Sequence, residues 1–125
     1  MKIRIKGNSI RFRLSQSDIE LFNKEGIIKE ETNFGNGQAQ FLYALVNQED
    51  AEKMTAAFQN NEIRVLVPED MATNWTATDL VGLSAQMPLE NEESLSILIE
   101  KDFKCLTVRA GEDEGDNFPN PHTVC

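Results

Sequence analysis

The chain has 125 residues, of which 40% are hydrophobic, and this composition suits one domain with a hydrophobic core. Its formal net charge of −9 disfavours binding to the phosphate backbone of DNA or RNA. No apolar run is long enough to span a membrane, and charges interrupt the N-terminal segment where a signal peptide needs an apolar core. We therefore expect a cytoplasmic protein with a single domain over residues 1–125, in which residues 110–125 form an extended tail packed on the rest.

A basic β-hairpin is predicted at the start of the chain. Apolar and cationic residues alternate in the runs 2–6 and 10–14, as in strands with one buried face, and Gly7-Asn8 suits a two-residue turn between them. This register puts Arg4 opposite Arg11 and Lys2 opposite Arg13. Like charges directly opposite each other are destabilising, so we expect something negative to lie over this face. The five residues concerned share one face of the hairpin, which we call the cationic face: Lys2, Arg4, Lys6, Arg11 and Arg13.

Two kinds of negative partner are compatible with the sequence, and a third possibility is that the cationic side chains splay outward into solvent and are screened by salt. The first is a set of the protein's own carboxylates, with Glu30, Glu31 and Glu100 as candidates, which would form ordinary surface ion pairs. The second is a bound anion, because arginine grips phosphate and carboxylate groups with its planar fork. No acidic residue occurs before position 15, so all 21 of them lie outside the hairpin.

Three short helices are predicted after the hairpin. Ser17 and Glu20 fit a capping box at the start of the first helix, and Gly26 fits a left-handed residue that ends it. Asp50 is a candidate cap for the second helix, and Pro68 suits the first position of the third. The predicted helices cover residues of about 18–25, 51–58 and 68–75.

The remaining apolar runs predict strands. These strands and the two or three short helices indicate an α+β fold. Its sheet is expected to be mainly antiparallel and curved, with about seven strands, and to open with a β-hairpin. A β-grasp-like fold and a partly closed barrel are the alternatives, and no internal repeat is evident. Beyond the hairpin, the predicted strands cover residues 27–34, 38–46, 63–67, 82–87 and 95–101.

The C-terminal segment concentrates possible metal ligands. Its acidic run supplies the oxygen ligands that a hard cation prefers, although the order of residues is not that of an EF-hand loop. A histidine and the two cysteines, Cys105 and Cys125, are ligand types that zinc accepts, but no fourth ligand is specified. Because acidic runs are commonly solvated, no cofactor is predicted. The candidates for a divalent metal are Asp113, Glu114, Asp116 and His122.

Two aromatic residues have predicted structural roles. Trp75 is expected in the core, and Phe118 is expected to hold the proline-containing tail against the domain.

The stretches MKIRIKGNSIRFRL, IEKDFKC and EDEGDNFPNPH together resemble a group of small, uncharacterised bacterial proteins with one domain. The similarity extends over almost the whole chain. Since that group has no established activity, the resemblance implies no catalytic or binding residue. It implies only that the opening hairpin and the tail belong to one architectural unit.

Two functions are compatible with these features. The first is a noncatalytic module that binds a protein partner or a small anion through the cationic face. The alternative is an enzyme acting on a phosphorylated or carboxylated metabolite, with the same cations positioning the substrate and the tail acids holding a metal. The chain contains no nucleophile elbow, phosphate-binding glycine loop or dinucleotide fingerprint. We expect a monomer or a homodimer paired through an edge strand, and no nucleic-acid or membrane partner.

Overall fold

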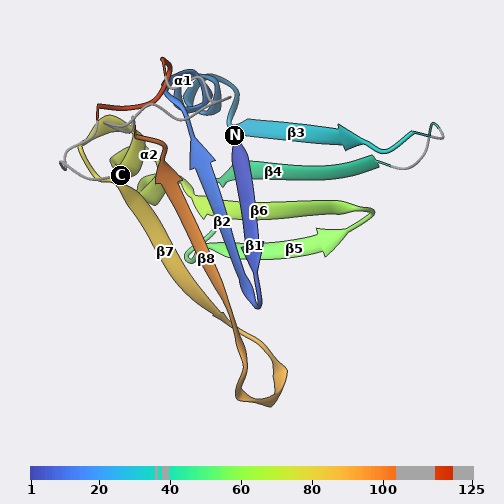
Figure 1. Ribbon diagram of the computed structural model, residues 1–125. Helices are drawn as coiled ribbons and strands as arrows, with labels where there is room; N and C mark the ends of the chain where they lie inside the picture. The colour runs from blue at the N-terminus through green and yellow to red at the C-terminus, as the bar shows by residue number, and fades with distance from the viewer. Residues whose placement is uncertain (36, 38–39, 104–114, 120–125) are drawn as a thin grey trace.

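A computed structural model describes residues 1–35, 37, 40–103 and 115–119 (Figure 1). The strands and helices follow one another as β1 (Lys2–Lys6), β2 (Ser9–Leu14), α1 (Gln16–Glu25), β3 (Ile27–Asn33), β4 (Gln40–Gln48), β5 (Thr55–Gln59), β6 (Glu62–Pro68), α2 (Glu69–Ala77), β7 (Gly82–Pro88), the short 3-10 helix η1 (Glu90–Glu92) and β8 (Ser94–Lys101).

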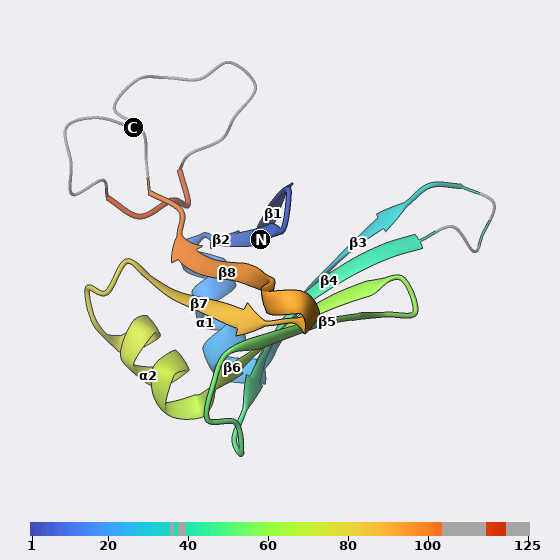
Figure 2. The same ribbon diagram turned by 90° about the horizontal axis from the view of Figure 1, so that it is seen from below.

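The strands form two four-stranded sheets. Sheet A has the order β1-β2-β8-β7, and sheet B has the order β3-β4-β6-β5. In each sheet two antiparallel hairpins are joined by a central parallel pair, β2 with β8 and β4 with β6. The strands of sheet A cross those of sheet B, and both helices lie near one end of the molecule (Figures 1 and 2).

This architecture confirms the α+β class and corrects the arrangement. The described residues form eight strands in two mixed sheets that are not closed, so the single curved sheet of about seven strands and the partly closed barrel are wrong. A β-grasp-like single sheet is not observed either. The physical reason is that each central parallel pair joins strands that do not follow one another in the chain, and no local sequence pattern specifies such a pairing.

The two halves of the chain have the same connectivity. The order β-β-α-β-β occurs first as β1-β2-α1-β3-β4 and again as β5-β6-α2-β7-β8. The counterparts of β1, β2, β8 and β7 are β5, β6, β4 and β3, so the strand order of sheet A becomes that of sheet B when each strand is replaced by its counterpart. The register of the paired strands also agrees. Phe12 faces Ile99 in the first parallel pair as Val65 faces Leu45 in the second. The fold therefore contains a pseudo-twofold repeat, which sequence analysis missed because the halves share mainly a hydrophobic pattern.

The core lies between the two sheets and extends under both helices. The ring of Phe12 on sheet A lies 5.8 Å from that of Tyr43 on sheet B. Phe22 of α1 and Trp75 of α2 are both fully buried, with their rings in edge contact at 6.5 Å. The indole nitrogen of Trp75 donates a hydrogen bond of 3.1 Å to the carbonyl of Val81. The prediction that Trp75 is a core residue is confirmed.

Residues 51–58 do not form the predicted helix. The described structure places β5 at the end of this segment, antiparallel to β6. Asn60 and Asn61 adopt positive φ angles of 52° and 62°, so they form the two-residue turn of a hairpin. The prediction failed because the asparagine pair was interpreted as a helix breaker, whereas its tolerance of left-handed backbone allows a tight turn.

The first helix begins two residues earlier than predicted. Its N-cap is Ser15, whose hydroxyl accepts a hydrogen bond of 3.3 Å from the backbone N–H of Asp18. The Asp18 carboxylate in turn accepts one of 3.0 Å from the backbone N–H of Ser15. A capping box is therefore present, but it is not formed by Ser17 and Glu20. Gly26 ends the helix in the predicted left-handed conformation, with φ of 76°.

The described part of the tail packs on the end of sheet A. The backbone N–H of Phe118 donates a hydrogen bond of 2.8 Å to the carbonyl of Asp102, and its ring lies 5.8 Å from that of Phe103. The ammonium of Lys101 lies 5.4 Å from the centre of the Phe118 ring. Phe118 thus makes the expected contact with the domain, while most of residues 110–125 lie outside the described part of the chain. Neither α-helix of the described structure is long and apolar enough to cross a membrane.

Candidate anion-binding site

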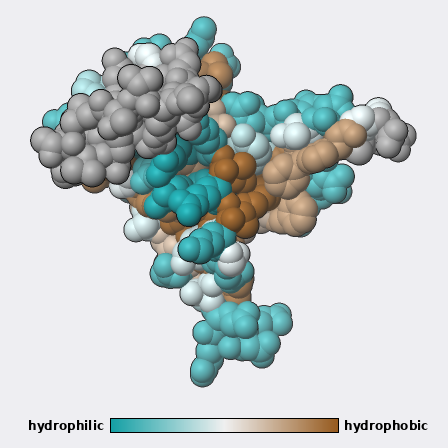
Figure 3. Space-filling model, in the orientation of Figure 1, coloured by the Kyte–Doolittle hydropathy of each residue, from teal (hydrophilic) through white to brown (hydrophobic). Residues whose placement is uncertain are grey.

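The cationic face lies on the outer surface of sheet A. The predicted hairpin register is confirmed, with Arg4 opposite Arg11 and Lys2 opposite Arg13. Lys6 is paired with Ser9, so all five cations project from the side of the sheet opposite the core. Hydrophilic side chains accordingly cover the surface over β1 and β2 (Figure 3).

Two carboxylates on or beside β8 form ion pairs with three of the five cations, and one of the two carboxylates is shared. Glu100 Oε1 lies 2.8 Å from Arg13 Nε and 3.4 Å from Arg11 Nε. Asp102 Oδ2 lies 3.0 Å from Lys2 Nζ. Of the predicted internal partners, Glu100 is therefore correct, because the parallel pairing of β2 with β8 brings it opposite Arg13.

The other two predicted carboxylates do not reach the cationic face. Glu30 Oε1 instead lies 2.9 Å from the amino nitrogen of Met1, and Glu31 makes no ion pair within the described residues. Among the described residues, carboxylates therefore pair with Lys2, Arg11 and Arg13 but not with Arg4 or Lys6.

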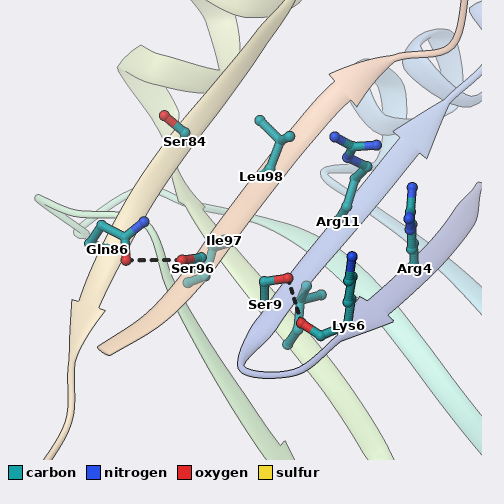
Figure 4. Close-up of a pocket in the computed structure, with 10 residues that line it drawn as sticks. Arg4, Lys6, Ser9, Arg11, Ser84, Gln86, Ser96, Ile97 and Leu98 are labelled. Carbon is teal, nitrogen blue, oxygen red and sulfur yellow. Dashed lines mark hydrogen bonds between the residues drawn. The ribbon is translucent and has the colours of Figure 1, made fainter. Parts of the chain in front are cut away.

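The other end of the cationic face borders a hollow of about 400 Å³ (Figure 4). The side chains of Arg4 and Lys6 are exposed there, and neither forms an ion pair within the described residues. No carboxylate lines this hollow in the part of the chain that the structure describes. Its polar lining consists of Arg4, Lys6, Ser9, Arg11, Ser84, Gln86 and Ser96.

Hydrogen-bond donors predominate in the hollow. Gln86 Oε1 accepts hydrogen bonds from Ser96 at 3.0 Å and from Ser94 at 3.1 Å, which fixes the orientation of the amide. The Gln86 amide nitrogen makes no hydrogen bond to the described residues, so it is available as a donor. The guanidinium of Arg4 and the ammonium of Lys6 are charged donors suited to a phosphate or carboxylate oxygen, and they project from β1 at the opposite edge of sheet A from Gln86 (Figure 4).

Sheet B has an equivalent hollow, in which the cations are already neutralised. Glu62 is the first residue of β6, as Ser9 is the first residue of β2, and it holds the corresponding position in the repeat. Its carboxylate lies 2.7 Å from Lys29 Nζ and 2.6 Å from Arg64 Nε. The hydrogen bonds from Lys29 and Arg64 lower the pKa of Glu62. The two hollows thus differ in where their charges lie. A carboxylate stands in sheet B where sheet A has the hydroxyl of Ser9, whereas Arg4 and Lys6 of sheet A correspond to the uncharged Ala57 and Gln59 of sheet B.

Several residues of the hollow were missed by sequence analysis. Ser84 and Gln86 come from β7 and Ser96 comes from β8, and only the order of strands in sheet A brings them beside the hairpin. Their alternation with apolar residues such as Ala85 and Ile97 was the available signal, since it assigns the polar side chains to the solvent face.

Of the four predicted metal ligands, only Asp116 lies within the described residues. Asp116 binds the N-terminus of α1, where its carboxylate accepts hydrogen bonds from the hydroxyl and the backbone N–H of Ser17. These bonds, the hydroxyl's above all, hold the pKa of Asp116 below its usual range. Asp113, Glu114 and His122 lie outside the described residues, as do Cys105 and Cys125. Within the described ranges, no three His, Cys, Asp or Glu residues are grouped to hold a metal ion.

The fold and the hollow define an α+β domain with two mixed sheets, one of which has a cationic hollow on its outer surface. The chain belongs to a family of unknown function, DUF7009, whose model matches residues 1–122. The match agrees with the resemblance of this chain to uncharacterised proteins of one domain. Comparison with curated proteins and with solved structures found no match.

Proposed function

We propose that this protein is a noncatalytic binding module that captures an anionic group, of the phosphate or carboxylate type, in the hollow on the outer surface of sheet A. The main support for this proposal is the difference in charge compensation between the hollows of the two sheets. In sheet B, Glu62 compensates Lys29 and Arg64, whereas in sheet A the exposed cations Arg4 and Lys6 have no carboxylate partner among the described residues.

The charge distribution of the chain supports this proposal. A molecule with a net charge of −9 repels anions at long range, so binding must be local and depend on direct contacts within about one Debye length of 8–10 Å. Arg4 and Lys6 both lie on β1, two residues apart on one face, and supply the positive charge. This combination favours one compact anionic group over an extended polyanion such as nucleic acid.

The test introduces into the hollow of sheet A the carboxylate that the hollow of sheet B already has. Ser9→Glu places a carboxylate beside Lys6 and Arg11, as Glu62 lies beside its own cations. We expect this variant to remain folded and to lose the response to anions. For the wild type, inorganic phosphate at ten times its Kd should raise the free energy of unfolding by about 1.4 kcal/mol. The measurement is thermal unfolding in phosphate against sodium chloride of equal ionic strength, with calorimetry for Kd.

The controls separate a specific site from a general charge effect. Arg4→Gln combined with Lys6→Gln should abolish the phosphate response. Lys24→Gln combined with Lys53→Gln changes the net charge by the same amount at exposed positions outside the hollow, and should leave the response intact. Equal phosphate responses of the wild type and Ser9→Glu would refute the proposal.

A further inference from the structure

The edge of sheet A beside the cationic face is open. β1 pairs with β2 on one side only, and no described strand pairs with its other edge. The alternation of an antiparallel ladder directs half of the backbone N–H and C=O groups of β1 away from β2. Proteins commonly protect such an edge with lysine and other charges, which repel a cationic strand but attract an acidic one.

An apolar groove of about 460 Å³ lies on the inner side of the same edge. Ile5 of β1 and Phe58 of β5 occupy equivalent positions in the two halves and are 54% and 65% exposed, respectively. Figure 3 shows the resulting hydrophobic patch, which runs from β1 onto sheet B beside the hydrophilic surface of the hairpin. The groove is lined principally by Ile5, Ile10, Phe41, Phe58, Met87 and Leu95.

A strand added to β1 would contact both surfaces at once. Successive side chains of a strand point to opposite faces, so one set would lie beside Arg4 and Lys6 and the other set would enter the apolar groove. The edge of β5 also borders the groove, but its outward residues are Ala57 and Gln59, which carry no charge. Charge complementarity therefore selects the edge of β1 for an acidic strand.

We propose that the partner is an extended protein segment in which acidic and apolar residues alternate, and that it pairs with β1 by strand addition. This proposal rests on the proposed function, because the acidic side chains of the segment would be the anionic groups bound at the cationic face. The backbone of β1 supplies hydrogen bonds, the groove selects apolar side chains, and the cations select acidic ones.

The test uses a synthetic peptide of about ten residues in which Glu alternates with Val, acetylated and amidated at its ends. We expect binding in fluorescence anisotropy and, by amide hydrogen exchange, added protection in β1 but none in β5. Phe58→Ser should weaken binding about tenfold, since it removes an exposed apolar wall of the groove. Phe34→Ser, which removes a phenylalanine that is 68% exposed and outside the groove, should leave binding unchanged.

Three further outcomes would overturn the proposal. A peptide alternating Lys with Val that binds as well as the Glu peptide would exclude charge selection. Protection in β5 instead of β1 would place the segment on the other edge. Sedimentation showing a dimer that Phe58→Ser dissociates, with no peptide bound, would assign the edge to a second copy of this chain.

The phosphate experiment separates this proposal from the one on which it rests. A wild-type protein that responds to phosphate but does not bind the Glu peptide would refute strand addition and leave the anion-binding hollow intact. A protein that responds to neither would refute both.

Discussion

Glu100 controls how much repulsion remains on the cationic face, and Glu100→Gln tests this directly. Glutamine keeps the size of the side chain and one acceptor oxygen but removes the charge shared by Arg11 and Arg13. The Glu100 side chain is only 18% exposed, whereas those of the two arginines are 33% and 38% exposed. Its interaction therefore lies between an exposed ion pair, at less than about 1 kcal/mol, and a buried charge-assisted hydrogen bond, at about 1.5–3 kcal/mol.

The substitution also exposes the repulsion between the arginines themselves. Two unit charges about 6 Å apart repel by about 0.7 kcal/mol in water. We expect Glu100→Gln to lower the free energy of unfolding by about 1–2 kcal/mol in low salt, which corresponds to a fall in Tm of about 3–8 °C for a domain of this size. Most of the repulsive part should disappear near 1 M salt, where the Debye length is about 3 Å.

The assay is thermal unfolding followed by circular dichroism at low and high sodium chloride. Glu20→Gln provides the matched control, because Glu20 is exposed on α1 and its replacement changes the net charge equally. If Glu100→Gln and Glu20→Gln have the same Tm in low salt, Glu100 does not relieve repulsion on this face and the electrostatic reasoning is wrong. Glu100→Gln should also bind phosphate more tightly than the wild type, since the carboxylate that competes for Arg11 has been removed.

Three other predictions concern single side chains. Arg4→Gln should raise Tm slightly in low salt, because Arg4 faces Arg11 and has no carboxylate partner among the described residues. Arg13→Gln should lower Tm, because Arg13 pairs with Glu100, and the same direction for both variants would contradict this assignment. Because the pKa of Asp116 is lowered in the folded state, its carboxylate stabilises the fold above the usual aspartate range, and this contribution is lost as pH falls through the folded-state pKa. The Tm difference between wild type and Asp116→Asn should therefore vanish at acidic pH. A constant difference from pH 7 to strongly acidic solution would exclude a stabilising role of the Asp116 charge. Gly82→Ala should lower the free energy of unfolding by about 1–3 kcal/mol in urea titration, because the new Cβ would lie 2.5 Å from the carbonyl oxygen of Ile99, and unchanged stability would disprove that close approach.

The local features of the site could be predicted because they depend on residues close together in the chain. The alternation around Gly7-Asn8 specified the hairpin, its register and the shared face of the five cations. The neutralising residues could be predicted only in part. The sequence offers Glu100 as one of three candidates and gives no sign of Asp102, because nothing near the hairpin indicates which distant strand will lie beside β2.

The pseudo-twofold repeat shows the same division. Each half contains hairpins with local signals, but the interpretation of Asn60-Asn61 as a helix breaker concealed the β5/β6 hairpin and with it the correspondence to β1/β2. Glu62 and Ser9 hold equivalent positions only in the context of the two paired sheets. The comparison that best supports an anion-binding hollow therefore required the tertiary structure.

The amino-acid sequence alone determined the class of fold, most strands and the cationic face, since alternation, turn residues and caps act over a few neighbouring positions. The tertiary structure decided the two-sheet arrangement, the polar residues that β7 and β8 bring to the hollow, and which cations are neutralised. These properties arise from the parallel pairs β2/β8 and β4/β6. The pairing of strands that do not follow one another in the chain depends on packing of the whole core, and no local sequence pattern specifies it.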